Sequence, residues 1–153
     1  MSKLYIFDFD NTIVNTAELI KTDGYKYDFY NLKIYKNTNS FIKNRIKRGH
    51  RVMILSKRKR IFKEKIQRFI KTRLKVNIEV KTVPAHFLKY LVINIYALKY
   101  KNVIVLDDMY KNEENNNPKK LYYPKISFSN IKYLIHDKII KIRGTKYYDQ
   151  ISN

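Results

Sequence analysis

Short apolar runs alternate with longer stretches of helical periodicity along most of the chain. Residues 4–9, 51–56 and 103–106 are dominated by apolar side chains, as expected of strands that are buried on both faces of a sheet. Apolar side chains also recur at every second position over residues 76–80. The pattern therefore predicts four short strands, and the residues between consecutive strands suffice for a connecting helix.

Three stretches between the predicted strands have apolar side chains at the spacing of an amphipathic helix. The first is expected to start at an N-cap, Thr38 or Ser40, and to stop at Gly49. The second spans residues 57–74, and the third has Pro84 in its first turn. The apolar positions that define these helices are Phe41, Ile42 and Ile46, then Ile61, Phe62, Ile66, Phe69, Ile70 and Leu74, and finally Leu88, Leu91, Val92, Ile95 and Leu98.

The remaining segments carry weaker signals. Residues 13–36 are mixed and rich in tyrosine, with Gly24 as a turn signal, which predicts a loop or hairpin. Residues 111–120 are polar and include an Asn-Asn-Asn-Pro run, which predicts a flexible loop. The stretch 121–143 is expected to hold one or two short strands and a helix.

The order of these elements predicts the fold class. Regular alternation of strands and helices is typical of an α/β fold, in which helices cover both faces of a mainly parallel sheet. The chain has 153 residues, of which 44% are hydrophobic, and this is enough for one core. We therefore expect residues 1–153 to form a single domain.

Polar side chains stand at the carboxyl ends of three predicted strands. Asp8 and Asp10 lie at the end of the first strand, Ser56 is the last residue of the second, and Asp107 and Asp108 follow the last. In a parallel sheet these ends meet at one edge, and ligands bind in the crevice beyond it. We expect the five side chains to lie together there.

Four carboxylates at one edge would repel one another unless a cation lies among them. Mg²⁺ prefers oxygen ligands, keeps several waters and commonly binds substrate phosphate. A serine hydroxyl could then donate to a phosphate oxygen, while a lysine neutralises the phosphoryl group. One aspartate could attack phosphorus and the other transfer a proton, so the pattern indicates phosphoryl transfer.

The charge balance points to a polyanionic partner. The chain has 33 Lys and Arg against 13 acidic residues, a net charge of +20, which favours nucleic acid, phosphorylated substrates or an anionic membrane surface. Abundant Lys, Asn, Ile and Tyr are also typical of proteins from AT-rich genomes. Cysteine is absent, and no apolar run approaches the roughly 20 residues of a membrane span. We expect a soluble, intracellular (cytoplasmic) protein whose oligomeric state the sequence leaves open.

The polar strand ends resemble the motifs of a known superfamily. DFDNTIVNT resembles the first motif of the haloacid dehalogenase-like phosphatases, an Asp-x-Asp-x-Thr after an apolar strand. MILSKR, with Ser56 at a strand end, resembles their second motif, and VIVLDD resembles their fourth. Lys89 lies 18 residues before Asp107, where the third-motif lysine is expected, although Lys81, which precedes Thr-Val-Pro, is a rival. The motifs follow the family's order over roughly residues 3–110.

The resemblance implies a Rossmann-like fold and Mg²⁺-dependent phosphoryl transfer through an aspartyl-phosphate. Asp8 is implied as nucleophile and metal ligand, and Asp10 as general acid/base with its backbone carbonyl on the metal. Asn11 replaces a frequent glycine of the first motif. Asp108 is implied as the direct metal ligand, with Asp107 close behind it and often acting through water, although the two roles could be exchanged. The implied site residues are Asp8 and Asp10 for catalysis, Thr12, Ser56, Arg58 and Lys89 for phosphate binding, and Asp8, Asp10, Asp107 and Asp108 for Mg²⁺.

The first two motifs are close together in the chain. Only residues 13–50 separate them, which leaves room for a small flap at 13–36 but for no full cap domain. Such an open site is similar to those of relatives that act on macromolecules. Ser56-Lys57-Arg58 also resembles the phosphatase half of phage polynucleotide kinase-phosphatases, although Lys57 departs from a usual glycine or asparagine. The resemblance implies removal of a terminal (3′) phosphate from DNA or RNA ends or from a nucleotide. The residues expected to bind nucleic acid are Lys57, Arg58, Lys59, Arg60 and Lys63.

Two alternative functions fit the same sequence. One is a small-molecule phosphomonoesterase whose basic charge is incidental. The other is a non-catalytic protein of the same fold that binds nucleic acid. The intact set of motifs argues against the second alternative, because a binding module has no need of all these residues.

Overall fold

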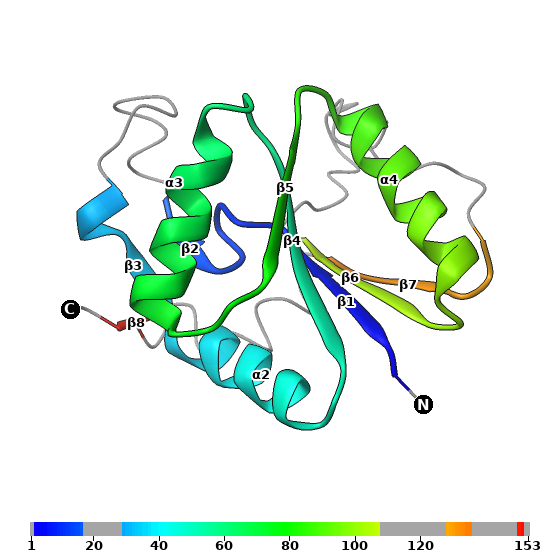
Figure 1. Ribbon diagram of the computed structural model, residues 1–153, viewed down its shortest axis with the longest axis horizontal. Coiled ribbons are helices and arrows are strands. Elements are labelled where there is room, and N and C mark those ends of the chain that lie inside the picture. Colours follow the sequence, from blue (N-terminus) through cyan, green and yellow to red (C-terminus); the bar gives the residue numbers. More distant parts are fainter. Residues whose placement is uncertain (1, 17–28, 108–127, 136–149, 152–153) are drawn as a thin grey trace, which may run out of the picture.

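The computed structural model (Figure 1) describes residues 2–16, 29–107, 128–135 and 150–151. The predicted loop at 111–120 lies outside these residues, as do most of the stretch 121–143 and the expected metal ligand Asp108. Within the described part, no helix is long and apolar enough to cross a bilayer.

A five-stranded parallel sheet forms the centre of the fold, which confirms the predicted α/β class. Its strand order is β5-β4-β1-β6-β7, and every neighbouring pair is parallel. The order reverses at β1, where successive strands are added first on one side and then on the other, as in other Rossmann-like sheets. The strands are β1 (Leu4–Phe7), β4 (Arg51–Lys57), β5 (Glu79–Val83), β6 (Val103–Asp107) and β7 (Ile131–Ile135).

Helices cover both faces of the sheet (Figure 1). Helices α2 (Lys36–Lys47) and α3 (Phe62–Phe69) lie on one face, and α4 (His86–Lys99) lies on the other. Because side chains alternate along a strand, β1 contributes to two apolar clusters. Tyr5 and Phe7 join the cluster under α2 and α3, whereas Leu4 and Ile6 join the cluster under α4.

A small antiparallel sheet follows β1 in the chain. Strand β2 (Val14–Asn15) pairs with β3 (Lys33–Tyr35), which pairs with β8 (Gln150–Ile151). A 3-10 turn, η1 (Phe29–Asn31), leads into β3. The described ends of the segment 13–36 thus pair as a hairpin, and no cap domain is evident among the described residues between β1 and β4.

Several predicted boundaries were wrong. Helix α3 starts at Phe62 and not at Lys57, which is the last residue of β4, and α4 starts at His86, so Pro84 precedes its first turn. Helix α2 starts at Lys36, before either predicted cap, because Tyr35 takes the N-cap position in extended backbone without a side-chain cap.

The helical segment before β5 ends at Leu74, as predicted, through a π-helical turn, η2 (Ile70–Leu74), that follows α3. Strand β5 nevertheless starts only at Glu79, later than predicted. Lys75 then takes a left-handed conformation with φ of 58°, so the chain turns before it can join the sheet.

The face of α4 that packs on the sheet was also predicted wrongly. Its buried residues are Lys89, Ile93, Tyr96 and Ala97, whereas three of the five apolar positions that defined the predicted helix are exposed, namely Leu91, Ile95 and Leu98. The helix is apolar nearly all round, so its periodicity does not distinguish an inner from an outer face. Ile61 was one of the apolar positions that defined the second helix, but it precedes α3 and is exposed.

Candidate active site

The carboxyl ends of β1, β4 and β6 bring three of the expected side chains to one edge of the sheet. Asp8 directly follows β1, and its backbone N–H donates to the Leu106 carbonyl of β6 at 2.8 Å. Asp107 is the last residue of β6, and Ser56 is the last but one of β4. Hydrogen bonding between adjacent parallel strands fixes these positions, so the acids of different motifs become neighbours.

Lys89 joins two of these acids. From the first turns of α4, its Nζ donates to Asp107 Oδ2 at 2.7 Å and to Asp8 Oδ1 at 3.1 Å. The rival lysine, Lys81, lies elsewhere and is half-buried, with its Nζ 3.7 Å from Glu79 Oε1. The geometry thus brings Lys89, and not Lys81, to the first-motif aspartate.

The two carboxylates keep Lys89 charged. Burial by itself would lower the pKa of Lys89, but the charges of Asp107 and Asp8 and their hydrogen bonds outweigh burial and raise the pKa well above the ordinary lysine value. A raised pKa means that the stabilisation is fully present below the unfolded-state pKa and is lost only as pH rises through the folded-state pKa. Lys89 is therefore a fixed positive charge across the neutral range.

Asp10 is held separately, by Arg58. The guanidinium Nε donates to Asp10 Oδ2 at 3.0 Å and its second terminal nitrogen donates to Asp10 Oδ1 at 2.7 Å. Such a two-point contact fixes the plane of the carboxylate as well as its distance. The Thr16 hydroxyl donates to Asp10 Oδ1 at 3.0 Å, so the Asp10 carboxylate is oriented by two residues.

Aromatic rings enclose Arg58. Its guanidinium carbon lies 5.8, 5.5 and 5.2 Å from the ring centroids of Phe9, Phe29 and Phe62. These residues come from three separate segments, and the side chain of Arg58 is only 1% exposed. Arginine suits this place because its planar, weakly hydrated cation can contact aromatic rings while it binds a carboxylate. Arg58 is therefore fixed in position and is no part of the exposed basic surface.

The turn that carries Asp10 is folded by local hydrogen bonds. The Phe9 carbonyl accepts from the backbone N–H of Thr12 and of Ile13, at 3.3 and 3.0 Å. Asn11 has a φ of 58°, a conformation that glycine adopts freely and that asparagine tolerates better than most residues. Its side-chain Oδ1 accepts from the Thr16 backbone N–H at 3.1 Å, so asparagine can stand where the superfamily frequently has glycine.

The described carboxylates fit a magnesium site that is shared with a substrate. Asp8 and Asp107 both contact one ammonium group, so their oxygens converge on the same region. Mg²⁺ is commonly held by one or two carboxylates, with water and substrate phosphate as its other ligands. Among the described residues no cluster of three or more potential metal-binding side chains occurs, and Asp108 is not among them.

Comparison with known sequences assigns the family. No curated protein matches the chain. The sequence model of the family described as polynucleotide kinase 3 phosphatase matches residues 3–133. The chain belongs to this family. The match spans all the motif residues and confirms the resemblance on which the sequence-based assignment depended.

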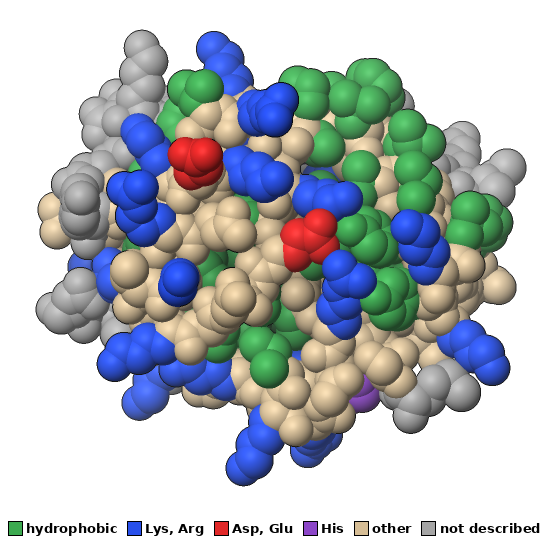
Figure 2. Space-filling view, in the orientation of Figure 1, with side chains coloured by type: hydrophobic (Ala, Val, Ile, Leu, Met, Phe, Trp, Pro, Cys, Tyr) green, Lys and Arg blue, Asp and Glu red, His purple; other side chains and the backbone are tan. Residues whose placement is uncertain are grey.

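The other expected site residues of this family member separate into buried and exposed groups. Thr12 and Ser56 are buried beside the acidic edge. The remaining residues expected to bind nucleic acid are exposed where the chain leaves β4 and enters α3, and Figure 2 shows Lys and Arg side chains spread over that part of the surface. These exposed residues, called here the α3 basic track, are Lys57, Lys59, Arg60 and Lys63.

Sequence reasoning missed the residues that surround Arg58 and Asp10. Thr16 has no recognisable motif, because a threonine after a short strand is common. Phe29 and Phe62 stack with ring centroids 6.4 Å apart, but in the sequence they are ordinary apolar positions. The resemblance of Ser56-Lys57-Arg58 to the family's second motif marked Arg58, although not its contact with Asp10.

Replacing Lys89 with methionine is expected to lower the free energy of unfolding by about 3 kcal/mol or more, because buried Asp107 and partly buried Asp8 lose their shared cation. Replacing Lys81, whose side chain is 41% exposed, with methionine is expected to change the free energy of unfolding by no more than about 0.5 kcal/mol. Urea unfolding in the presence of EDTA measures both without a contribution from bound metal. Equal losses in the two variants would contradict the assignment of Lys89 to the site.

Proposed function

We propose that this protein is a phosphatase that removes a 3′ phosphate from the end of a polynucleotide. Membership of the family supports this substrate class. The observation that carries the chemistry is the placement of the acids: Lys89 draws Asp8 and Asp107 together, while Arg58 fixes Asp10 beside them. The Asp8 carboxylate is thus aligned by the Lys89 ammonium group, and the Asp10 carboxylate by the Arg58 guanidinium. These different surroundings suit a nucleophile and a proton-transfer group.

The proposed reaction has two displacements at phosphorus. In the first, Asp10 is protonated: a carboxylate oxygen of Asp8 forms a bond to phosphorus, the bond to the 3′ oxygen breaks, and Asp10 gives that oxygen its proton and becomes a carboxylate. In the second, Asp10 takes a proton from water, the water oxygen bonds to phosphorus, and the acyl-phosphate bond to Asp8 breaks. Inorganic phosphate leaves, and both carboxyl groups return to their starting states.

The surrounding groups are assigned to charge and orientation. Lys89 neutralises the phosphoryl oxygens without changing protonation, and Ser56 can donate its hydroxyl to one of them. Asp8 and Asp107, with Asp108 and the Asp10 backbone carbonyl, are the groups that would hold Mg²⁺, whose contribution there is to neutralise phosphate charge. Arg58 acts through Asp10, because its two-point contact keeps the proton-transfer group aimed at the reacting oxygen.

The α3 basic track is proposed to hold the nucleic-acid strand. It begins at Lys57, the last residue of β4 and the neighbour of Ser56, and its cations are exposed, in contrast to Arg58. A single strand whose phosphates contact these cations releases counterions, so binding weakens as salt rises. The track therefore accounts for a polymeric substrate, which the acidic site alone does not require.

Replacing all four residues of the track with alanine is expected to weaken the salt dependence of kcat/KM on a 3′-phosphorylated oligonucleotide. The slope of log(kcat/KM) against log[salt] should become less negative by about 0.7 for each phosphate that the variant no longer neutralises. A matched control removes four exposed cations from the first helix and its end, namely Lys36, Lys43, Lys47 and Arg48. Equal changes in the two variants would show that overall charge, and not the track, attracts the strand.

The proposed function is tested by phosphate release from a panel of phosphoesters, with Mg²⁺ present and then with EDTA. The panel contains 3′- and 5′-phosphorylated oligonucleotides, mononucleotides and phosphopeptides. Turnover should be fastest on the 3′-phosphorylated oligonucleotide, disappear in EDTA and return with added Mg²⁺. Equal turnover of mononucleotides that is insensitive to salt would instead support a small-molecule phosphatase.

A further inference from the structure

Helix α4 differs from the other two helices in its outward face. The exposed residues of α3 are charged or polar, as expected of a helix on the surface of a protein. Four of the five exposed residues of α4 are large and apolar. A helix that is apolar on both faces is normally covered on both, which indicates that another surface packs against this one.

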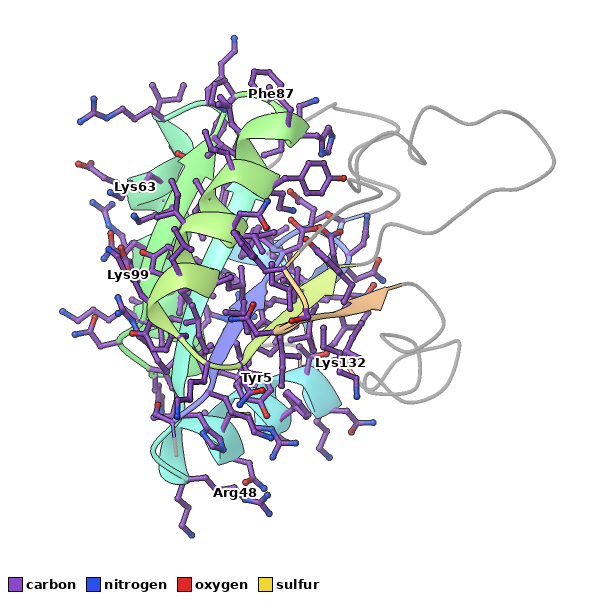
Figure 3. All side chains as sticks on the ribbon, turned by 90° about the vertical axis from the view of Figure 1, so that its right-hand side faces the viewer. Tyr5, Arg48, Lys63, Phe87, Lys99 and Lys132 are labelled. Carbon is purple, nitrogen blue, oxygen red and sulfur yellow. The ribbon has the colours of Figure 1, made fainter. Side chains whose placement is uncertain are left out.

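The exposed apolar residues form one continuous ridge along α4. Their exposed fractions are 69% for Phe87, 55% for Leu91, 45% for Ile95 and 72% for Leu98. Spacings of four, four and three residues keep them on one side of the helix. Figure 2 shows apolar side chains gathered over α4, and in Figure 3, which faces this helix, Phe87 and Lys99 mark its two ends.

The ridge is separate from the site described above. The helix has only two charged residues: Lys89 points inward to the acids, and Lys99 is its last residue. The ridge has no cation that could bind a phosphate, so it offers a polyanion no electrostatic contact. This lack of charge contrasts with the chain as a whole, of which 30% is charged. An apolar partner therefore suits the ridge, whereas nucleic acid does not.

We propose that the ridge is the contact between two copies of this protein. The spacing of the ridge is nearly the same when it is read from either end. In an antiparallel pair of α4 helices, Phe87 of one copy therefore faces Leu98 of the other, and Leu91 of one copy faces Ile95 of the other. Both pairings have almost the same midpoint along the helix, so one two-fold axis satisfies them together. A two-fold contact requires this self-complementarity, whereas a contact with an unrelated protein does not.

The size of the ridge makes this contact a reversible one. If each of the four side chains buries on the order of 100 Å², two copies bury roughly 800 Å² between them, below the 1,200–2,000 Å² of stable interfaces. Each copy also carries a net charge of +20, so the copies repel one another at low salt. Added salt screens this repulsion and should strengthen the dimer, which is the opposite of its effect on nucleic-acid binding.

Sedimentation velocity of the whole chain tests the proposal. The dimer fraction should rise with protein concentration over the micromolar range, and rise again between low and high NaCl. The double substitution Leu91→Asn and Leu98→Asn keeps the net charge and should leave only monomer. Ile61→Asn removes an equally exposed apolar side chain from another face and should leave the dimer unchanged. A wild-type protein that stays monomeric at high concentration and high salt would overturn the proposal.

Crosslinking tests the orientation of the two copies, because the chain has no cysteine of its own. Phe87→Cys mixed with Leu98→Cys should form a dimer with a short bis-maleimide crosslinker. Phe87→Cys alone should not, since the two copies of that position would lie roughly 16 Å apart along antiparallel helices. Crosslinking of Phe87→Cys alone would overturn the antiparallel arrangement. Phosphate release should be unaltered in the variant with asparagine at positions 91 and 98. The experiments on the dimer and those on phosphatase activity therefore test two independent proposals.

Discussion

Replacing Asp8 with asparagine is expected to reduce phosphate release from a 3′-phosphorylated oligonucleotide by about 10⁴-fold or more, because the variant has no attacking carboxylate oxygen. Asparagine has nearly the same shape, and Lys89 keeps its 2.7 Å contact with Asp107. We therefore expect the variant to fold and to bind the oligonucleotide. The measurement is phosphate release at saturating substrate, together with oligonucleotide binding by fluorescence anisotropy.

Glu79→Gln is the matched control for Asp8→Asn, since it removes the same charge at the opposite end of the sheet. Glu79 is the first residue of β5 and pairs with Arg51 at 2.7 Å, away from the acidic edge. Its turnover should stay within about twofold of the wild type. Substantial turnover by Asp8→Asn would mean that another group attacks phosphorus, and the proposed mechanism would be wrong.

Replacing Arg58 with lysine is expected to lower kcat by about 10²-fold, with a smaller change in KM. Lysine keeps the positive charge but cannot make the two-point contact that fixes Asp10, and a small displacement of a reacting group has an effect of about this size. It also cannot make the planar contact with three aromatic rings. Steady-state kinetics on the 3′-phosphorylated oligonucleotide measure both constants.

Arg60→Lys provides the comparison for Arg58→Lys, because Arg60 is exposed two residues further on. It should retain kcat within about twofold. Thermal unfolding of both variants distinguishes a local change at Asp10 from loss of the folded state. If folded Arg58→Lys had a wild-type kcat and a raised KM, Arg58 would contact substrate and would have no part in orienting Asp10.

Much of the fold could be predicted from the sequence because strands and helices have different periods. The apolar runs at 4–9, 51–56 and 103–106 correspond to β1, β4 and β6, because a strand buried on both faces leaves no polar positions in its middle. Boundaries were predicted less well. The left-handed turn at Lys75 that precedes β5 and the start of α2 without a side-chain cap depend on packing, which local sequence patterns do not record.

The acidic edge could be predicted for a similar reason. Burying a carboxylate after an apolar strand costs free energy unless the strand ends at a functional site that binds the charge. The sequence pattern is therefore enough to identify Asp8 and Asp107 as site residues. Choosing Lys89 over Lys81 required the structure, because both lysines precede Asp107 at plausible distances along the chain. Only the packing of α4 on the sheet shows that Lys89 reaches the two carboxylates.

Local patterns in the amino-acid sequence are sufficient to define the α/β class, the family and the acids at the strand ends, because none of these depends on tertiary contacts. The partners of those acids and the orientation of α4 depend on how distant segments pack. Arg58 binds Asp10, which is 48 positions away in the chain. Aromatic rings from three separate segments surround the Arg58 guanidinium and hold it in place. Helix α4 is apolar all round, so only its packing on the sheet shows which apolar side chains form the core and which form the exposed ridge.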